Sequence, residues 1–379
     1  MAQLTKEQIA IRDMTREFVQ KEVAPFAADW DRTATVPLDT LRRIGTLGLF
    51  GVCVPTEWGG SGADFTSYVL ATEELAYGDA GVCNMVSATN SFALKVRDYG
   101  TPEQKERFLR PVASGREIAC LVLTEPHAGS DVANLKTRAV RHGDRYVLNG
   151  TKNFITGGRS SSVAVVLAVT DPGAGKRGIS AFLVRTDRRG YRVVRDEHKL
   201  GHRSNDTCQI LLEDLEVPAE DVLGAPGQGL KIALSGLDSG RVGVAAQSVG
   251  VARAAFDAAL RYAREREAFG KKLLDHQAIA FELAEMATDI EVARQMYLHA
   301  AGLKETRVRS IKEASMAKLF ASRMCERVCS AAIQIHGGYG YVNDYPVEKL
   351  YRDARVFQIY DGTNEVQKIL ISRELAAGH

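Results

Sequence analysis

The hydrophobic pattern of this chain changes its period twice, and this change constrains the fold more than any single motif. Near both ends, apolar residues recur every three or four positions, which is typical of helices. Between the two ends stand short runs rich in Val, Ile and Leu, separated by turn residues. The order predicts an α+β protein with an N-terminal helical domain over 1–116, a middle β domain over 117–226 and a C-terminal helical domain over 227–379.

Local signals place elements within the first two segments. Two capping boxes, from Thr5 to Gln8 and from Thr101 to Gln104, predict helix starts, and a further helix is expected over 66–77. In the middle segment, the turn over 142–144 predicts a hairpin. Because no helical period separates the apolar runs, we expect an antiparallel barrel or sandwich.

The third segment predicts a C-terminal four-helix bundle of the up-and-down kind, shared between the two ends of the chain. Its seam has steps of three and four through Ile279, Leu283, Met286, Ile290, Ala293, Tyr297 and Ala300. A capping box beginning at Ser310 predicts the start of the next helix, and the glycine pair at 337–338 predicts its end.

Charge and composition argue against several function classes. A formal net charge of +2 does not suggest nucleic acid or an anionic membrane as a partner. No apolar run approaches the ~20 residues of a spanning helix, and the first 20 residues lack a signal-peptide core, so we expect a cytoplasmic protein. Six scattered cysteines with no zinc-like spacing predict reduced thiols and no metal site.

The segment 359–366 holds the candidate catalytic residue. Thr363 is a good N-cap for the helical run that follows, so the Asp361 carboxylate is expected just before a helix N-terminus. Gly362 allows a sharp turn or a close backbone approach. This arrangement suits a general base, although the same residues also fit an ordinary turn and cap.

Several motifs, taken in order and spacing, resemble the acyl-CoA dehydrogenase family over essentially the whole chain. They are the segments 55–60, 121–131, 152–158, 264–270, 334–341, 352–355 and 359–366. The resemblance implies FAD, bound where two subunits of a homotetramer meet, the tetramer being a dimer of dimers. It also implies an acyl-CoA substrate and an electron-transferring flavoprotein as the electron acceptor.

The resemblance assigns cofactor contacts by position. Leu123 and Thr124 match the strand end that bonds the flavin pyrimidine ring, and Ser130 lies near the flavin and the CoA arm. Phe154 sits beside the ring, and Thr156 bonds flavin N5. The remaining matches are to the diphosphate and ribityl region (Arg266, Phe269), the adenosine side (Gln277, Gln334, Gly338) and the flavin phosphates (Thr363).

The resemblance also implies the reaction, which is α,β-dehydrogenation to a 2-enoyl-CoA. The base at 361 removes the α-proton, and the β-hydrogen leaves as hydride to flavin N5. The backbone N–H at 361 and a ribityl hydroxyl stabilise the thioester oxygen. Asp238 and Arg241 match the pantetheine and acyl channel, while Tyr360 and Gly362 flank the base on the substrate side.

The sequence departs from the family at the base itself, because the usual residue is Glu and this chain has Asp361. The carboxylate retracts by about 1.5 Å if the backbone stays in place, and a base must come within ~3.2 Å of its proton. One branch of the family carries its base at the position of Gly240, which cannot act. Asp361 is therefore expected to serve an α-branched or alicyclic acyl group, or to be a weaker base.

Other functions stay open. The Asp base also resembles flavin oxidases of the same fold, such as nitroalkane oxidases, which reduce O2 directly. A third alternative for Asp361, besides a closer substrate and a weaker base, is an active site that now catalyses another reaction. The enzyme can also run in reverse as a reductase. A DNA-associated flavoprotein of this superfamily would need a strongly basic face, which the net charge of +2 does not suggest.

Overall fold

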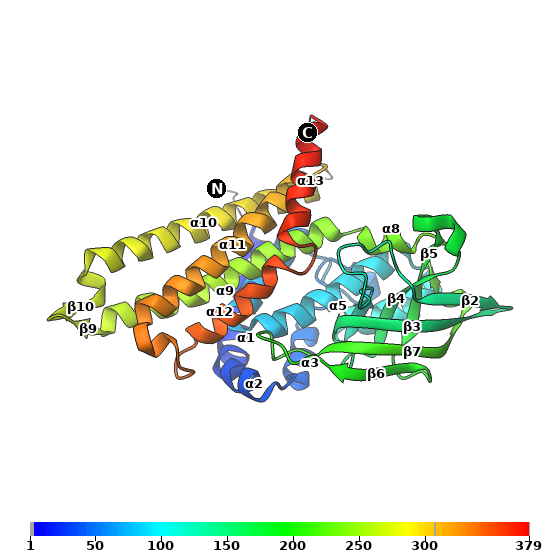
Figure 1. Ribbon diagram of the computed structural model, residues 1–379, viewed down its shortest axis with the longest axis horizontal. Coiled ribbons are helices and arrows are strands. Elements are labelled where there is room, and N and C mark those ends of the chain that lie inside the picture. Colours follow the sequence, from blue (N-terminus) through cyan, green and yellow to red (C-terminus); the bar gives the residue numbers. More distant parts are fainter. Residues whose placement is uncertain (1–3, 307, 379) are drawn as a thin grey trace.

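The computed structural model describes residues 4–306 and 308–378. The first part of the chain is helical, and both predicted capping boxes are present, at Thr5 and at Thr101. The helices are α1 (Lys6–Glu22), α2 (Ala27–Thr33), α3 (Leu38–Thr46), α4 (Phe65–Gly78), α5 (Ala80–Tyr99), α6 (Pro102–Gln104) and α7 (Arg110–Ala113). A π-helical turn, Lys105–Leu109, joins α6 to α7. Figure 1 shows α2 and α3 below the long C-terminal helices and α5 beside the sheet.

The middle segment forms one eight-stranded sheet, in which β6-β7-β3-β2-β4-β5-β8 follow one another and β1 pairs with β4. The strands are β1 (Ala119–Val122), β2 (Arg138–His142), β3 (Arg145–Thr156), β4 (Val163–Val169), β5 (Ile179–Arg185), β6 (Tyr191–Asp196), β7 (Thr207–Pro218) and β8 (Val222–Leu223). The predicted hairpin joins β2 and β3. The expectation of a wholly antiparallel sheet was wrong, because β4 pairs in parallel with β1 and β2.

The sheet curls over itself. Tyr146 on β3 and Phe182 on β5 stack edge to face at 5.2 Å, although β2 and β4 separate their strands in the sheet. Alternate residues of β4 therefore face two different apolar clusters. Ala164 lies inside the curl, whereas Val163 packs in the cluster that includes Phe92 of α5. This is the barrel-like arrangement expected for the middle segment.

Long helices return after the sheet. They are α8 (Gly229–Leu234), α9 (Leu237–Glu265), α10 (Gln277–Glu305), α11 (Ile311–His336), α12 (Val347–Ala354) and α13 (Asn364–Ala376), with the small hairpin β9 (Glu267–Ala268) and β10 (Lys271–Lys272) between α9 and α10. The prediction of a capping box at Ser310 was wrong, because the Ser310 side chain accepts no hydrogen bond from the helix. α11 ends before Gly337, as predicted.

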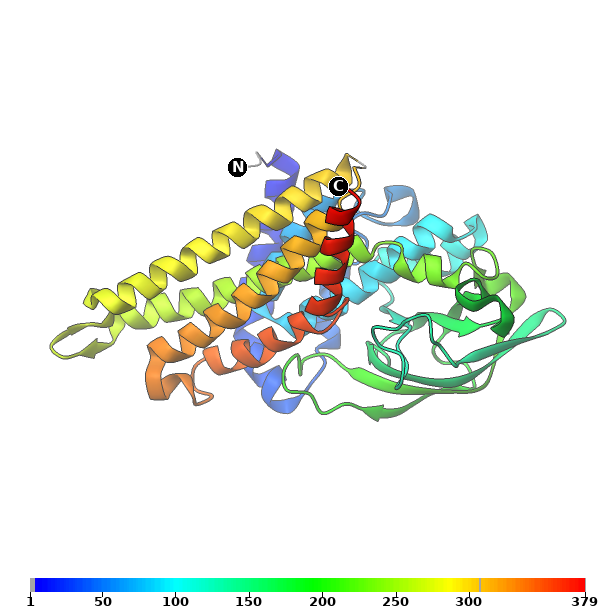
Figure 2. The ribbon, with the colours of Figure 1, turned by 45° about the horizontal axis from the view of Figure 1, so that its top comes forward.

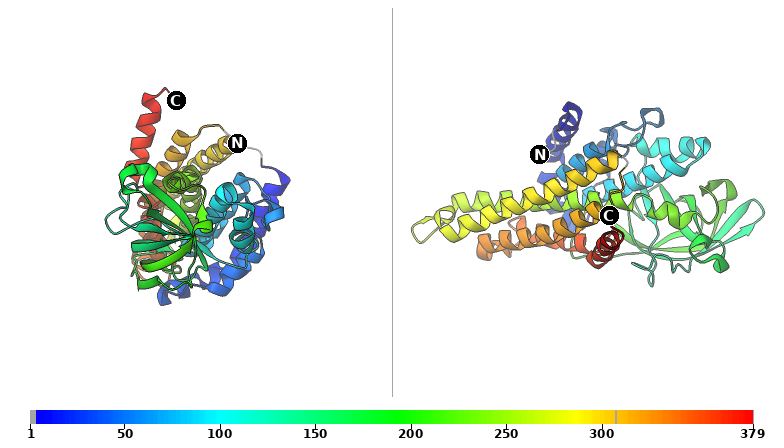
Figure 3. Two further views of the ribbon diagram at one scale, coloured as in Figure 1. Left: turned by 90° about the vertical axis from the view of Figure 1, so that its right-hand side faces the viewer. Right: turned by 90° about the horizontal axis from the view of Figure 1, so that it is seen from above.

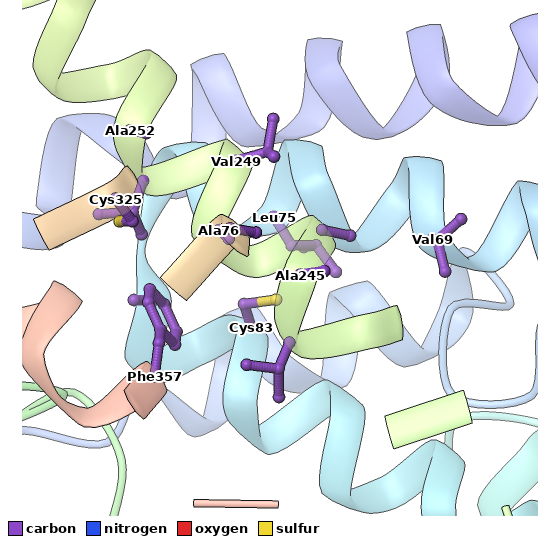
Figure 4. Close-up of a cluster of buried hydrophobic side chains, with 14 of the residues drawn as sticks. Val69, Leu75, Ala76, Cys83, Ala245, Val249, Ala252, Cys325 and Phe357 are labelled. Atoms are coloured by element: carbon purple, nitrogen blue, oxygen red, sulfur yellow. The ribbon is translucent and has the colours of Figure 1, made fainter. Parts of the chain in front are cut away.

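A four-helix bundle is shared between the two ends of the chain, since α4 packs against α9 and α10, and α11 packs against the same two helices. Figures 2 and 3 show the long C-terminal helices of this bundle side by side. Gly250 on α9 permits the close approach of α4, because a Cβ there would lie 2.2 Å from the Glu73 carbonyl oxygen. Figure 4 shows Leu75 of α4, Val249 of α9 and Cys325 of α11 in one apolar cluster. The predicted α10 seam is buried in this cluster, with Ile279 partly buried at its edge.

Within the described residues, no helix combines the length and apolar character needed to cross a membrane.

Candidate active site

Asp361 lies in the short loop between α12 and α13, in an uncommon backbone conformation. Its φ is +50°, and the φ of Gly362 is +86°. Asp is one of the few residues with a side chain that tolerates the left-handed region, and glycine adopts it freely. Thr363 then caps α13, as predicted, by accepting a hydrogen bond from the Val366 amide at 3.3 Å. The two left-handed residues therefore turn the chain directly into a helix.

Side chains from α11 and α13 hold this loop in place. The Lys318 Nζ donates to the Gly362 carbonyl at 2.9 Å and to Asn364 Oδ1 at 3.1 Å. Gln367 Nε2 donates to the same Gly362 carbonyl at 2.7 Å. The sequence did not single out Lys318 or Gln367, and the contact of Lys318 with Gly362 joins segments far apart along the chain. The result is a loop whose position is set before any ligand binds.

The reactive groups of Asp361 are left free by the rest of the chain. Within the described residues its carboxylate has no hydrogen bond and no ion pair, and its backbone N–H donates no hydrogen bond. The carboxylate faces Gly240 on α9, where a Cβ would lie 3.3 Å from Oδ2. An acceptor and a donor of one residue thus stand side by side without partners, as an oxyanion site with an adjacent base requires.

Charge and burial shift the titration of this carboxyl in opposite directions. Crowding by protein atoms raises the pKa of Asp361 above its ordinary value, although the residue is exposed at the surface of the chain. The cations Lys318, Lys95 and Arg241 lower the pKa, in that order of effect, and burial wins. A carboxyl with a raised pKa is a stronger base once deprotonated, which suits proton abstraction.

The predicted substrate residues on α9 lie beside Asp361. Arg241 is buried and forms an ion pair with Asp238 one turn earlier, and the charge of Asp361 also acts on it. The Arg241 Nε is buried without a hydrogen-bond partner in the described chain. Tyr360 donates to Gln247 Oε1 at 2.7 Å, and Gln247 Nε2 donates to Ser87 Oγ at 3.0 Å. This last chain of contacts ties the loop to α9 and α5.

A second group of predicted residues lies at the adjoining ends of β1 and β3. Lys152 is buried and donates to the Leu123 carbonyl at 3.0 Å and to Glu125 at 2.9 Å. The backbone N–H of Asn153 donates to the backbone carbonyl of Thr124 at 2.9 Å. The Thr124 hydroxyl makes no hydrogen bond within the described chain. The buried Lys152–Glu125 pair, which the sequence did not reveal, therefore fixes a strand end that keeps a free donor.

Phe154 and Thr156 form the wall beside that strand end. A register shift between β3 and β7 falls between Lys152 and Ile155, and it turns Phe154 outward with a φ of +55° and 62% exposure. The Thr156 hydroxyl accepts from Asn84 of α5 at 3.4 Å. An exposed ring beside a few aimed polar groups fits one wall of a flavin. Ser130 lies in the exposed loop that follows β1.

The remaining predicted cofactor residues lie at the opposite end of the molecule, around the tips of α9, α10 and α11. Arg266 and Gly338 line an open groove of about 630 Å³. A Cβ on Gly338 would meet nothing within 4 Å, so the backbone is open to a ligand. Phe269 is 97% exposed. Gln277 and Gln334 are exposed at the same tips. A guanidinium beside open glycine backbone suits a diphosphate.

One chain does not bring these two groups together. Gly240 and Arg266 stand at opposite ends of α9, which at ~1.5 Å per residue places them roughly 39 Å apart. Figure 1 shows the β9–β10 hairpin at one end of the molecule and the large sheet at the other. A single flavin cofactor does not span this distance, so the predicted residues fit one cofactor only if each site combines two protomers.

Comparisons with known proteins cover the whole chain. Residues 5–116, 120–215 and 227–376 match the N-terminal, middle and C-terminal domains of acyl-CoA dehydrogenases. The chain is 46% identical over 376 residues to the probable acyl-CoA dehydrogenase YngJ of Bacillus subtilis, across 98% of this chain and 99% of that protein. It is 44% identical over 364 residues to the caffeyl-CoA reductase-Etf complex subunit CarC of Acetobacterium woodii, across 96% of each. The structure of butyryl-CoA dehydrogenase from Megasphaera elsdenii superposes with a TM-score of 0.97 at 40% identity, across 99% of this chain and 100% of that one.

Proposed function

The chain belongs to the acyl-CoA dehydrogenase family, an oxidoreductase family whose members carry FAD, and we propose that it converts an acyl-CoA to the 2-enoyl-CoA with Asp361 as the base. The observation that carries this proposal is the free Asp361 carboxylate, with its raised pKa, on a loop held by Lys318 and Gln367. No other carboxylate takes its place at Gly240, which has no side chain.

Each residue near Asp361 has a defined task in this reaction. The carboxylate takes the α-proton of the acyl group, and the Asp361 N–H donates to the thioester oxygen as negative charge develops there. Arg241 and Lys318 favour the charged form of the base. Bound FAD supplies the acceptor for the β-hydrogen, which leaves with its electron pair. The resulting flavin reduction is what an experiment can follow.

We assign the FAD contacts to two protomers. Thr124, Phe154 and Thr156 of one protomer hold the ring system, with Leu123, Ser130 and Thr363 beside it. Arg266 and Gly338 of the neighbouring protomer hold the diphosphate and adenosine side, together with Phe269, Gln277 and Gln334. The separation of the two groups within one chain supports this assignment. We propose a homotetramer, assembled as a dimer of dimers.

The proposed substrate is an acyl-CoA with an α-branched or alicyclic acyl group. The Asp carboxylate is about 1.5 Å shorter in reach than Glu, so the α-carbon must lie closer to the loop. Gly240 bears on this idea, because a Cβ at this position would lie only 3.3 Å from Asp361 Oδ2, so any larger residue would crowd the base. We therefore expect the α-carbon to approach Asp361 without obstruction from this position of α9.

The proposed electron acceptor is an electron-transferring flavoprotein. The likeness to a subunit of a caffeyl-CoA reductase-Etf complex supports this partner, and it also favours a second candidate function, reduction of an enoyl-CoA in the reverse direction. All six cysteines are free thiols, and five of them are buried. Free thiols of this kind support a reducing compartment, and we place the protein in the cytoplasm.

Anaerobic bleaching of the flavin by a panel of linear, α-branched and alicyclic acyl-CoA thioesters tests the proposal. The expected result is rapid bleaching by α-substituted thioesters and slower bleaching by linear ones of equal carbon number. Preference for linear chains would contradict the proposed substrate. Rapid peroxide formation in air, with no response to CoA thioesters, would point instead to the flavin oxidase.

A further inference from the structure

Before the last turn of α5, one face of the helix is half-buried and the rest is buried. The half-buried residues recur at helical spacing and are Asn84, Ser87, Ala88, Ser91 and Leu94. At one end of this stripe Asn84 contacts Thr156. In the middle, Ser87 contacts Gln247, which holds Tyr360 next to Asp361. The α5 stripe therefore runs from the Thr156 side past the residues that hold Tyr360 beside Asp361.

Lys95 stands at the far end of the α5 stripe, one turn after Ser91, with only 6% of its surface exposed. Among the described residues, its Nζ donates hydrogen bonds only to Ser91, to the hydroxyl at 2.8 Å and to the carbonyl at 3.4 Å. No carboxylate of the described residues lies within 4 Å of this nitrogen. A buried ammonium without an anionic partner is unusual, because burial without pairing is costly.

The other buried lysines have structural partners. Lys152 pairs with Glu125, and Lys349 pairs with Asp79 and Asp353. Lys318 has no carboxylate partner, but it holds the catalytic loop through two oxygen atoms. Lys95 holds no loop and joins no two elements of the fold. Its polar head is therefore not explained by the stability of the protein.

Positive charge is in excess around Asp361. Lys95, Arg241 and Lys318 all act on the single carboxylate of Asp361, while Asp238 is already paired with Arg241. The charges that act on Lys95 itself are those of Asp361 and of Asp98, which is exposed. Burial lowers the pKa of Lys95 to about 8, so the amine still carries its proton at neutral pH.

We propose that Lys95 is a specificity-determining residue that binds a carboxylate at the far end of the acyl group, so that the substrates are dicarboxylic acyl-CoA thioesters. The inference rests on the proposed function and adds to it, because the α-substituted acyl group proposed above would also end in a carboxylate. A carboxylate gives the buried ammonium a charge-assisted partner, with Ser91 beside it. A hydrocarbon end would instead cover the ammonium and remove its remaining water.

The test compares thioesters that differ only at the far end of the acyl group. Pairs with four to six acyl carbons carry either a free carboxylate or the corresponding carboxamide, and kcat/KM is measured for each with the FAD-loaded enzyme. We expect the carboxylate to be preferred by wild type. Lys95→Met should reduce kcat/KM for the carboxylate by about 10- to 100-fold while sparing the carboxamide, and Lys95→Arg should keep part of the preference.

Two control variants separate recognition from packing. Ser91→Ala removes the hydroxyl partner of Lys95 but leaves the cation, so the carboxylate should still be preferred. Lys304→Met removes a half-buried lysine of α10 that lies 5.2 Å from the Phe65 ring and off the α5 stripe, and it should leave the preference unchanged. A purely structural role for Lys95 would lower both rates together in Lys95→Met.

The outcomes distinguish this inference from the proposed function. Preference of wild type for the carboxamide, or an unchanged ratio in Lys95→Met, would overturn the role of Lys95 while dehydrogenation stands. No flavin bleaching with any thioester of either series, or with neutral acyl-CoA, would instead overturn the proposed function itself.

Discussion

Gly240 on α9 and Asp361 on the loop before α13 lie directly opposite each other. A Cβ on Gly240 would lie 3.3 Å from Oδ2 and 3.7 Å from Cγ of Asp361. In the family this chain belongs to, the resemblance places an alternative base at the Gly240 position. The two positions are adjacent in space, so we expect a base at either one to reach the same substrate carbon.

Moving the base across the cleft tests this relationship. Asp361→Gly removes the base and fits the φ of +50°, which glycine adopts freely. We expect a loss of kcat by about 100- to 10,000-fold. Adding Gly240→Glu in the same chain should restore part of the activity. If the double variant is no faster than Asp361→Gly, measured by steady-state turnover on one acyl-CoA, the two positions do not serve the same carbon.

Lengthening the carboxylate tests the idea that Asp361 matches the shape of the substrate. Asp361→Glu should speed up linear thioesters and slow α-branched or alicyclic ones, because the longer side chain occupies their space. We expect the ratio of the two kcat/KM values to change by about 10- to 100-fold. A uniform change for both substrate classes would indicate that reach is not what selects them.

Removing the cation beside the base shifts the pH dependence. Lys318 is the largest of the charges that lower the pKa of Asp361. In Lys318→Met the pKa of Asp361 rises further, and because the base acts when deprotonated, the acid limb of kcat/KM moves to higher pH. Lys318→Arg keeps the charge and should leave the limb near its wild-type position. An unchanged pH dependence of kcat/KM in Lys318→Met would show that the charge of Lys318 does not affect the pKa of the base.

The buried pair of Lys152 and Glu125 supports the strand end at Leu123. Lys152→Met leaves a buried carboxylate unpaired, and we expect the free energy of unfolding to fall by about 3–5 kcal/mol. Adding Glu125→Gln should recover part of this loss, because the unpaired charge is then gone. Denaturant unfolding of the three variants measures both effects. An equal free energy of unfolding for Lys152→Met and wild type would show that the ion pair does not stabilise the fold.

Mixing two defective variants tests whether each FAD site combines two protomers. Thr156→Val impairs the ring side, and Arg266→Glu impairs the diphosphate side, so each variant alone should bind FAD weakly. Co-expressed chains form hybrids in which one site combines the intact halves. We expect FAD content and turnover to recover in the hybrid to at most half of the wild-type level. No recovery in a verified hybrid would place both halves within one chain.

Local signals allowed much of the fold to be predicted. Thr5, Thr101 and Thr363 cap their helices as expected, because a cap depends on neighbours within one turn. The cap at Ser310 failed, since its φ of −135° and ψ of 28° turn the side chain away from the helix N-terminus. Parallel pairing of β4 could not be predicted, because strand order depends on contacts between distant residues.

The candidate site was predictable only in part. The motif around Asp361 and the resemblance to a family predicted the base, but its neighbour Gly240 is far away in the sequence. Lys95, Lys152 and Lys318 were not singled out, because a lysine in a helix or strand is ordinarily exposed. Only the packed structure shows that these three are buried and which oxygen atoms each one meets.

The most direct test of the account is the rate of flavin bleaching in a single anaerobic turnover, compared between wild type and Asp361→Asn, each loaded with FAD and saturated with the same α-branched acyl-CoA. Asn keeps the size and the backbone N–H of Asp361 but cannot take a proton. The account predicts unchanged FAD content and substrate binding, with bleaching slower by about 100- to 10,000-fold. Bleaching by Asp361→Asn at the wild-type rate would contradict the assignment of Asp361 as the base.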